Sequence, residues 1–167
     1  MKAISLWQPW ASLMQTGAKQ VETRSWSTNY RGPLLICSAK KGLSKADLKE
    51  QMTYFSFIEG LFPLVRNEFK ILGKTTSLEA RDKEIEVLPF GKALCVVDLI
   101  NVVPVEQVRA ADYSMNEVFF GDYSEGRYAW ITKNRRPIKP VPITGRQGLF
   151  NPPEELIENL EYLSIER

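Results

Sequence analysis

The sequence predicts an α+β fold in which a small mixed β-barrel carries helices at its ends. Two observations support this prediction. The apolar runs that suggest strands are short and are broken by Gly and Pro. The helical segments are interspersed irregularly, whereas a parallel α/β sheet would alternate strands and helices. At 167 residues the chain suits a single domain with a substantial core.

The first four elements are a strand at residues 2–6, a helix at 8–17 and two further strands at 19–26 and 30–39. The helix is indicated by its ends, because Pro9 suits a first helical turn and Gly17 is a stop signal. Trp10, Leu13 and Met14 follow helical spacing, so we expect them to form one buried stripe.

The later elements begin with a helical insertion at residues 44–72, a polar connection at 73–90, a long strand at 92–103 and a short helix at 105–112. Two strands at 128–133 and 147–150 and a C-terminal helix at 152–163 follow. We expect the prolines of PIKPVPITG to separate the last two strands. Asn151 is expected to be the N-cap of the final helix.

The composition excludes several classes of site. The chain has no histidine, which removes Ser-His and Cys-His nucleophile pairs and any His-containing zinc site. Cys37 and Cys95 are too far apart for a metal-ligand motif and lie in apolar runs, so buried free thiols are expected. We therefore predict no metal and no cofactor. No apolar run reaches the ~20 residues of a membrane helix and no secretory signal is evident, so no membrane association and a cytoplasmic location are expected.

Charge is segregated along the chain, although the net charge is only +2. Residues 1–46 carry seven basic residues and one acid, and residues 126–153 carry six basic residues and no acid. Residues 47–125 carry eight basic and fourteen acidic residues. Two basic segments around an acidic middle predict one basic face that suits a polyanion such as nucleic acid. Chance segregation is the alternative.

The stretch GAKQVETRSW places Lys19, Glu22 and Arg24 within six positions. On a strand Glu22 and Arg24 share one face. Lys19 would point to the opposite face, unless it lies in the turn after Gly17, from which it could swing to the same side. These charges predict either a surface ion pair or a ligand-binding cleft. Glu22 has three possible roles, namely to orient Lys19 or Arg24, to accept a hydrogen bond from a base amino group, or to act as a general acid or base.

Several blocks of the sequence resemble the ASCH domain, a member of the PUA-like β-barrel superfamily. The blocks are ISLWQPWASLMQTGAKQVETRSW, YRGPLLICSAKK, LPFGKALCVVDLINVV, FGDYSEGRYAWIT and TGRQGLF, in this order over residues 1–150. The family motif G-x-K-x-x-E-x-R corresponds to Gly17, Lys19, Glu22 and Arg24. The resemblance implies a PUA-like barrel with a basic cleft beside the first helix.

The resemblance also implies that the cleft binds RNA, another single-stranded nucleic acid or a modified nucleoside. Residues 17–24 of the motif and their neighbours would line it, and the ligand-binding candidates are Trp7, Gln8, Lys19, Glu22, Arg24, Tyr128 and Trp130. The alternative is a hydrolase for acylated cytidine, or a ribonuclease, with Lys19 and Glu22 as catalytic residues. A protein-interaction module is a third option, and the sequence leaves catalysis and the oligomeric state open.

Two residues depart from the family pattern. Many relatives carry histidine at the position of Cys37, and the acyl-cytidine hydrolases carry threonine where this chain has Glu22. A later basic cluster is expected to contact phosphates without reading sequence, and consists of Lys133, Arg135, Arg136, Lys139 and Arg146.

Overall fold

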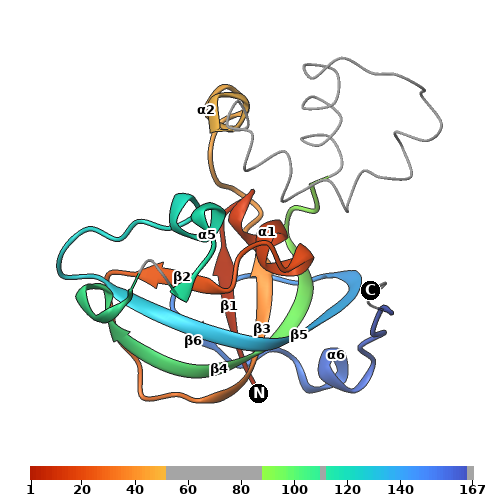
Figure 1. Ribbon diagram of the computed structural model, residues 1–167. Helices are drawn as coiled ribbons and strands as arrows, with labels where there is room; N and C mark the ends of the chain where they lie inside the picture. Colours follow the sequence, from red (N-terminus) through yellow and green to blue (C-terminus); the bar gives the residue numbers. More distant parts are fainter. Residues whose placement is uncertain (52–87, 110–111, 165–167) are drawn as a thin grey trace.

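The computed structural model describes residues 1–51, 88–109 and 112–164 (Figure 1). Within these residues six strands form one mixed sheet in the order β2-β5-β4-β3-β1-β6. The strands are β1 (Lys2–Leu6), β2 (Val21–Arg24), β3 (Gly32–Ser38), β4 (Lys92–Pro104), β5 (Tyr128–Pro142) and β6 (Leu149–Phe150). The helices are α1 (Trp10–Thr16), α2 (Lys45–Gln51), α5 (Met115–Phe119), α6 (Glu154–Glu158) and the short 3-10 helix η1 (Val105–Gln107).

The sheet is mixed because β1 pairs with β3 in parallel, whereas β6, β2 and β5 join their neighbours antiparallel. The long strands β4 and β5 pair along their length with three register shifts. Such bulges bend and twist strands, and the two strands sweep around the sheet in Figure 1. The sheet therefore forms a half-barrel with helices beside it, which confirms the predicted α+β class.

The core lies on both faces of the sheet. Successive residues of a strand point to opposite faces, so alternate residues belong to different parts of the core. On one face Ile4, Leu6, Leu34 and Ile36 pack with Ala11 and Met14 of α1. On the other face lie the alternate residues of the same strands together with residues of α6, namely Ala3, Leu35, Cys37, Leu156 and Ile157. The runs LLIC and ALCVV are apolar throughout because their strands are covered on both sides.

The predicted break at PIKPVPITG is wrong, because β5 continues through Pro137 and Pro140 to Pro142. The pairing explains this. Strand β2 pairs only with residues 128–131 of β5, so the later half of β5 has a free edge within the described sheet. Proline lacks an N–H group and is tolerated at such an edge. The C-terminal segment covers this edge, since Leu163 N–H donates to the carbonyl of Pro137.

Two helix predictions need correction, and a third lies largely outside the described residues. The C-terminal helix α6 has five residues, and its N-cap position is Pro153 and not Asn151. It ends early because residues 161–163 run along the edge of β5, where Tyr162 forms a bridge with Ile138. Of the short helix predicted at residues 105–112, residues 105–107 form η1 and residues 108–109 are not helical, whereas residues 110–111 lie outside the described residues. Of the helical insertion at 44–72, α2 is described, and the rest of that prediction lies outside the described residues.

Candidate functional site

Helix α1 ends at a residue that has to be glycine. Gly17 adopts a left-handed conformation with φ of 87°, and its N–H donates to the carbonyl of Leu13. A Cβ atom at this position would lie 2.6 Å from Nε of Arg135. Arg135 Nη1 donates to the carbonyl of Gln15 at 2.7 Å, at the end of the helix where the dipole favours a cation. The close approach of Arg135 therefore adds to the backbone's requirement for glycine.

The charges that follow Gly17 form a linked row. Lys19 is buried, with 2% of its surface exposed, and its ammonium group donates to the carbonyl of Val21. Lys19 Nζ lies 3.6 Å from one oxygen of Glu22, and Arg24 Nη1 lies 3.6 Å from the other. The Arg24 guanidinium also lies 5.8 Å from the ring centre of Trp26. The Glu22 carboxylate is thus held between two cations.

A carboxylate on α5, which the sequence analysis missed, accepts hydrogen bonds from the backbone at the start of β2. Glu117 is 2% exposed, and its two oxygens accept the backbone N–H groups of Gln20 and Val21 at 2.6 and 3.0 Å. Burial raises the pKa of Glu117 above its usual value, and the positive charge of Lys19 opposes that rise. The sequence contained a signal for this helix start, because Ser114 and Glu117 have capping-box spacing. In the structure Ser114 Oγ accepts from Glu117 N–H.

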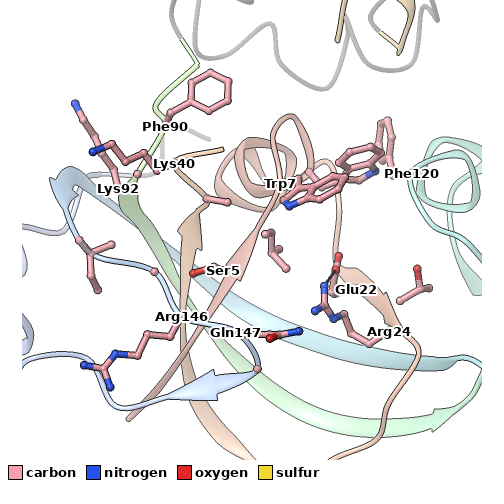
Figure 2. Close-up of a pocket in the computed structure, with 18 of the residues that line it drawn as sticks. Ser5, Trp7, Glu22, Arg24, Lys40, Phe90, Lys92, Phe120, Arg146 and Gln147 are labelled. Carbon is pink, nitrogen blue, oxygen red and sulfur yellow. Dashed lines mark ion pairs between the residues drawn. The ribbon is translucent and has the colours of Figure 1, made fainter. Parts of the chain in front are cut away.

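A cavity of about 1420 Å³ opens beside this row (Figure 2). It is lined by β1, by β2 and by the segments around residues 39–40, 90–92, 119–122 and 142–148. Figure 2 shows two sides. We call them the motif side, with Trp7, Phe120, Glu22 and Arg24, and the cationic side, with Lys40, Lys92 and Arg146.

The two sides differ in how their charges are paired. The acids that line the cavity are Glu22 and Asp122. Glu22 is held by Lys19 and Arg24, and Asp122 lies 3.4 Å from Nε of Arg127. On the cationic side, none of the three basic residues forms an ion pair with a carboxylate of the described residues. The cavity therefore carries its excess positive charge on the cationic side.

Three of the predicted ligand-binding residues line the cavity, namely Trp7, Glu22 and Arg24. Trp7 is 54% exposed. A Cβ atom at Gly42 would lie 3.4 Å from Trp7 Cγ, so Gly42 packs closely against the indole. This support holds an exposed aromatic ring at the cavity.

The other predicted ligand-binding residues do not line the cavity and make contacts within the fold. Trp130 is 0% exposed in the core, and its Nε1–H donates to the carbonyl of Trp26 at 3.2 Å. Buried Gln8 accepts from Ser12 N–H and donates to the carbonyl of Pro89, so it joins the start of α1 to the segment just before β4. Tyr128 packs against the same core cluster as Trp130. Lys19 is buried behind Glu22.

Of the basic residues predicted to contact phosphate, Arg146 lines the cavity. Arg135 binds the end of α1, Arg136 pairs with Asp98 at 2.5 and 3.2 Å, and Lys139 pairs with Glu161 at 3.3 Å. Lys133 is exposed on β5 and does not line the cavity. The cationic side is completed by Lys40 and Lys92, which the sequence analysis did not single out. The basic character of residues 1–46 was the only sequence signal for Lys40, and Lys92 lies outside that segment.

Both cysteines are free and buried, and burial raises the pKa of each thiol to about 12. Cys37, at the position where many relatives carry histidine, therefore packs in the core as a neutral thiol. Among the residues that the structure describes, no group of three or more His, Cys, Asp or Glu side chains is arranged to hold a metal ion. None of the described helices has the length and apolar character needed to cross a membrane.

Comparisons with known proteins agree with this architecture. Crystal structures of ASCH from Zymomonas mobilis and of a single-residue mutant of it share the fold at a TM-score of 0.50 and 13% identity. The match covers 96% of this chain and 95% and 98% of theirs. Activating signal cointegrator 1 of Homo sapiens and of Mus musculus is 40% identical over 148 residues, which is 88% of this chain. The chain spans 21% of the length of these relatives.

The family model of the ASCH domain matches residues 4–142, which is most of the chain and most of the half-barrel. The sequence resemblance is therefore confirmed at the level of the family, and the PUA-like mixed barrel at the level of the fold. This chain belongs to the ASCH domain family.

Proposed function

We propose that this chain binds RNA, or a nucleotide, in the cavity beside α1. The observation that carries the proposal is the content of that cavity. It combines cations that pair with no carboxylate of the described residues on one side with an exposed tryptophan and a held carboxylate on the other. Cations suit phosphates, and aromatic rings suit unpaired bases. The volume of about 1420 Å³ accommodates a nucleotide or a short segment of single strand.

Trp7 and Glu22 would read the base in this arrangement. Trp7 offers an exposed indole on which a base stacks, a contact worth about 1–3 kcal/mol. Glu22 keeps its carboxylate between Lys19 and Arg24 while it lines the cavity, so it can accept a hydrogen bond from an exocyclic amino group. In this proposal Glu22 keeps the predicted role in base reading, and Lys19, which does not line the cavity, orients Glu22.

Fluorescence anisotropy with a short single-stranded RNA tests this proposal. Affinity should fall steeply between about 50 and 200 mM salt, because phosphate contacts release counterions. Trp7→Ala should weaken binding about tenfold or more. Tyr162→Ala is the matched control, since Tyr162 is equally exposed at 54% but does not line the cavity. Equal affinities for the two variants would place the binding site elsewhere.

A hydrolase for acylated cytidine, or a ribonuclease, is the second candidate. It is favoured by Glu22, a carboxylate that reaches the cavity with a lysine 3.6 Å away. Acylated cytidines and end-labelled RNA are the substrates to incubate with the protein. Turnover that disappears in Glu22→Gln, while the variant still binds RNA, would establish catalysis. Intact substrates after long incubation would leave binding as the function.

A further inference from the structure

The cationic side of the cavity is built from three chain segments that meet at Gly91. Lys40 follows β3, Lys92 begins β4, and Arg146 lies in the loop after β5. The carbonyl of Gly91 accepts from Ile143 N–H at 3.0 Å, and a Cβ atom at Gly91 would lie 3.5 Å from Cβ of Lys40. These contacts bring together cations that are far apart in the sequence.

Further hydrogen bonds hold Lys92 in place. Ser38 Oγ accepts from Lys92 N–H at 3.1 Å and donates to the carbonyl of Lys92 at 3.2 Å, which joins the end of β3 to the start of β4. Lys92 is also the register partner of Pro142, just before the loop that carries Arg146. The backbone position of Lys92 is therefore set by the sheet, and the loop of Arg146 begins beside it.

A buried hydroxyl group without a partner lies in the same cavity. Ser5 lines the cavity, and its Oγ is buried with no hydrogen-bond partner among the described residues. A Cβ atom at Gly145 would lie 2.4 Å from Ser5 Oγ, so the loop that carries Arg146 passes directly against this hydroxyl. Figure 2 shows Ser5 between the two sides of the cavity. A buried hydroxyl normally has a partner, so Ser5 Oγ marks a place in the cavity wall where the described residues leave a hydrogen bond unmade.

We propose that the cationic side binds the terminal phosphate of a nucleotide or of a nucleic-acid end, with the base towards Trp7. This inference rests on the proposed function and specifies its ligand. A terminal phosphomonoester carries a charge of about −1.5 to −2 at pH 7, whereas each internal diester carries −1. Lys40, Lys92 and Arg146 carry three positive charges that no carboxylate of the described residues pairs. Their attraction scales with the charge of the anion, so a dianion is favoured.

The test compares one RNA sequence with three ends, namely a 5′-phosphate, a 3′-phosphate and hydroxyl groups at both ends. Nucleoside monophosphates and inorganic phosphate serve as competitors, which separates a nucleic-acid end from a free nucleotide. We expect at least about tenfold tighter binding of one phosphorylated end at pH 7.5. This preference should shrink below about pH 6, where the monoester loses its second charge.

Lys92→Ala and Arg146→Ala should reduce the preference for the phosphorylated end to about twofold or less. Lys133→Ala should leave it unchanged, because Lys133 is exposed away from the cavity. Circular dichroism spectra check that each variant is folded.

The outcomes separate the two proposals. Equal binding of all three RNA ends, with loss of affinity in Trp7→Ala, overturns the terminal-phosphate site and leaves RNA binding intact. A preference that survives in both Lys92→Ala and Arg146→Ala also overturns this site. Binding of nucleoside monophosphates without binding of RNA supports the phosphate site and removes RNA as the ligand. Absence of binding by every probe removes both.

Discussion

The two sides of the cavity use basic residues in opposite ways. On the motif side, Lys19 and Arg24 are each 3.6 Å from Glu22, and Lys19 is buried. On the cationic side, Lys40, Lys92 and Arg146 have no carboxylate partner among the described residues. A basic residue in a binding cleft can therefore hold the site together or bind the ligand. Removal of the first kind should reduce stability, and removal of the second should reduce affinity.

Lys19→Met should have the largest effect on stability. It removes the cation that lies 3.6 Å from Glu22 and near buried Glu117, so Glu22 keeps only Arg24 as its cation and Glu117 loses a compensating positive charge. Loss of one partner of a buried pair typically costs about 3–5 kcal/mol, and the partial exposure of Glu22 places the expected loss near 3 kcal/mol. Denaturant unfolding measures this, with Lys133→Met as the exposed control. Equal unfolding free energies for the two variants would contradict the structural role of Lys19.

Glu117→Gln should reduce the free energy of unfolding by about 1–3 kcal/mol, because the amide cannot accept the N–H groups of both Gln20 and Val21. The wild type should also show a pH dependence that the variant lacks. Burial raises the folded-state pKa of Glu117 above the ordinary 4.5, so its contribution to stability is greatest below that pH and declines as pH rises through the folded-state pKa.

The difference in unfolding free energy between Glu117→Gln and the wild type should therefore change as pH rises from the ordinary value of 4.5 through the folded-state pKa of Glu117. Unfolding titrations at several values from about pH 4 to about pH 8 measure it. A constant difference across the whole range would show that Glu117 titrates as an exposed carboxyl group does.

Arg146→Ala and Arg136→Ala compare an arginine that pairs with no carboxylate of the described residues and one that pairs with Asp98. Arg146 lines the cavity, so its removal should weaken RNA binding about tenfold and lower the salt slope by about one. Arg136 is engaged by Asp98, so its removal should leave the affinity within about twofold. Anisotropy titrations across a salt series measure both. A larger loss for Arg136→Ala would restore the sequence-based expectation that this residue contacts phosphate.

Asp98→Asn should have the smallest effect, under about 1 kcal/mol, because the pair with Arg136 is partly exposed. The side-chain hydrogen bond from Arg136 lowers the pKa of Asp98. Its stabilising contribution is therefore present above the unfolded-state pKa and is lost as pH falls through the folded-state value. Thermal melts of wild type and variant should converge in acid and differ slightly at neutral pH. A difference that persists in acid would argue against this ion pair.

Local signals were sufficient for the elements around the motif. The stop signal at Gly17, the helix around Leu13 and Met14 and the short strand 2–6 are all realised in the structure. The single buried stripe is not, because Met14 and Leu13 pack in different core clusters and half-buried Trp10 lines the cavity. Other parts depended on neighbours that no local pattern reveals. Trp130 occurs in an alternating strand that allowed either face, and its burial follows from the packing of Trp26 at 4.6 Å between ring centres.

The sequence by itself determined the family, the α+β class, the end of α1 and the spacing that joins Lys19, Glu22 and Arg24. These features depend on local backbone preference and short-range spacing. Only the tertiary structure decided which cations face the cavity. It pairs Arg136 with Asp98, buries Lys19, and joins Lys40 and Lys92 to the loop of Arg146 through Gly91. The physical reason is that a charge becomes available to a ligand only when the fold leaves it without an internal partner.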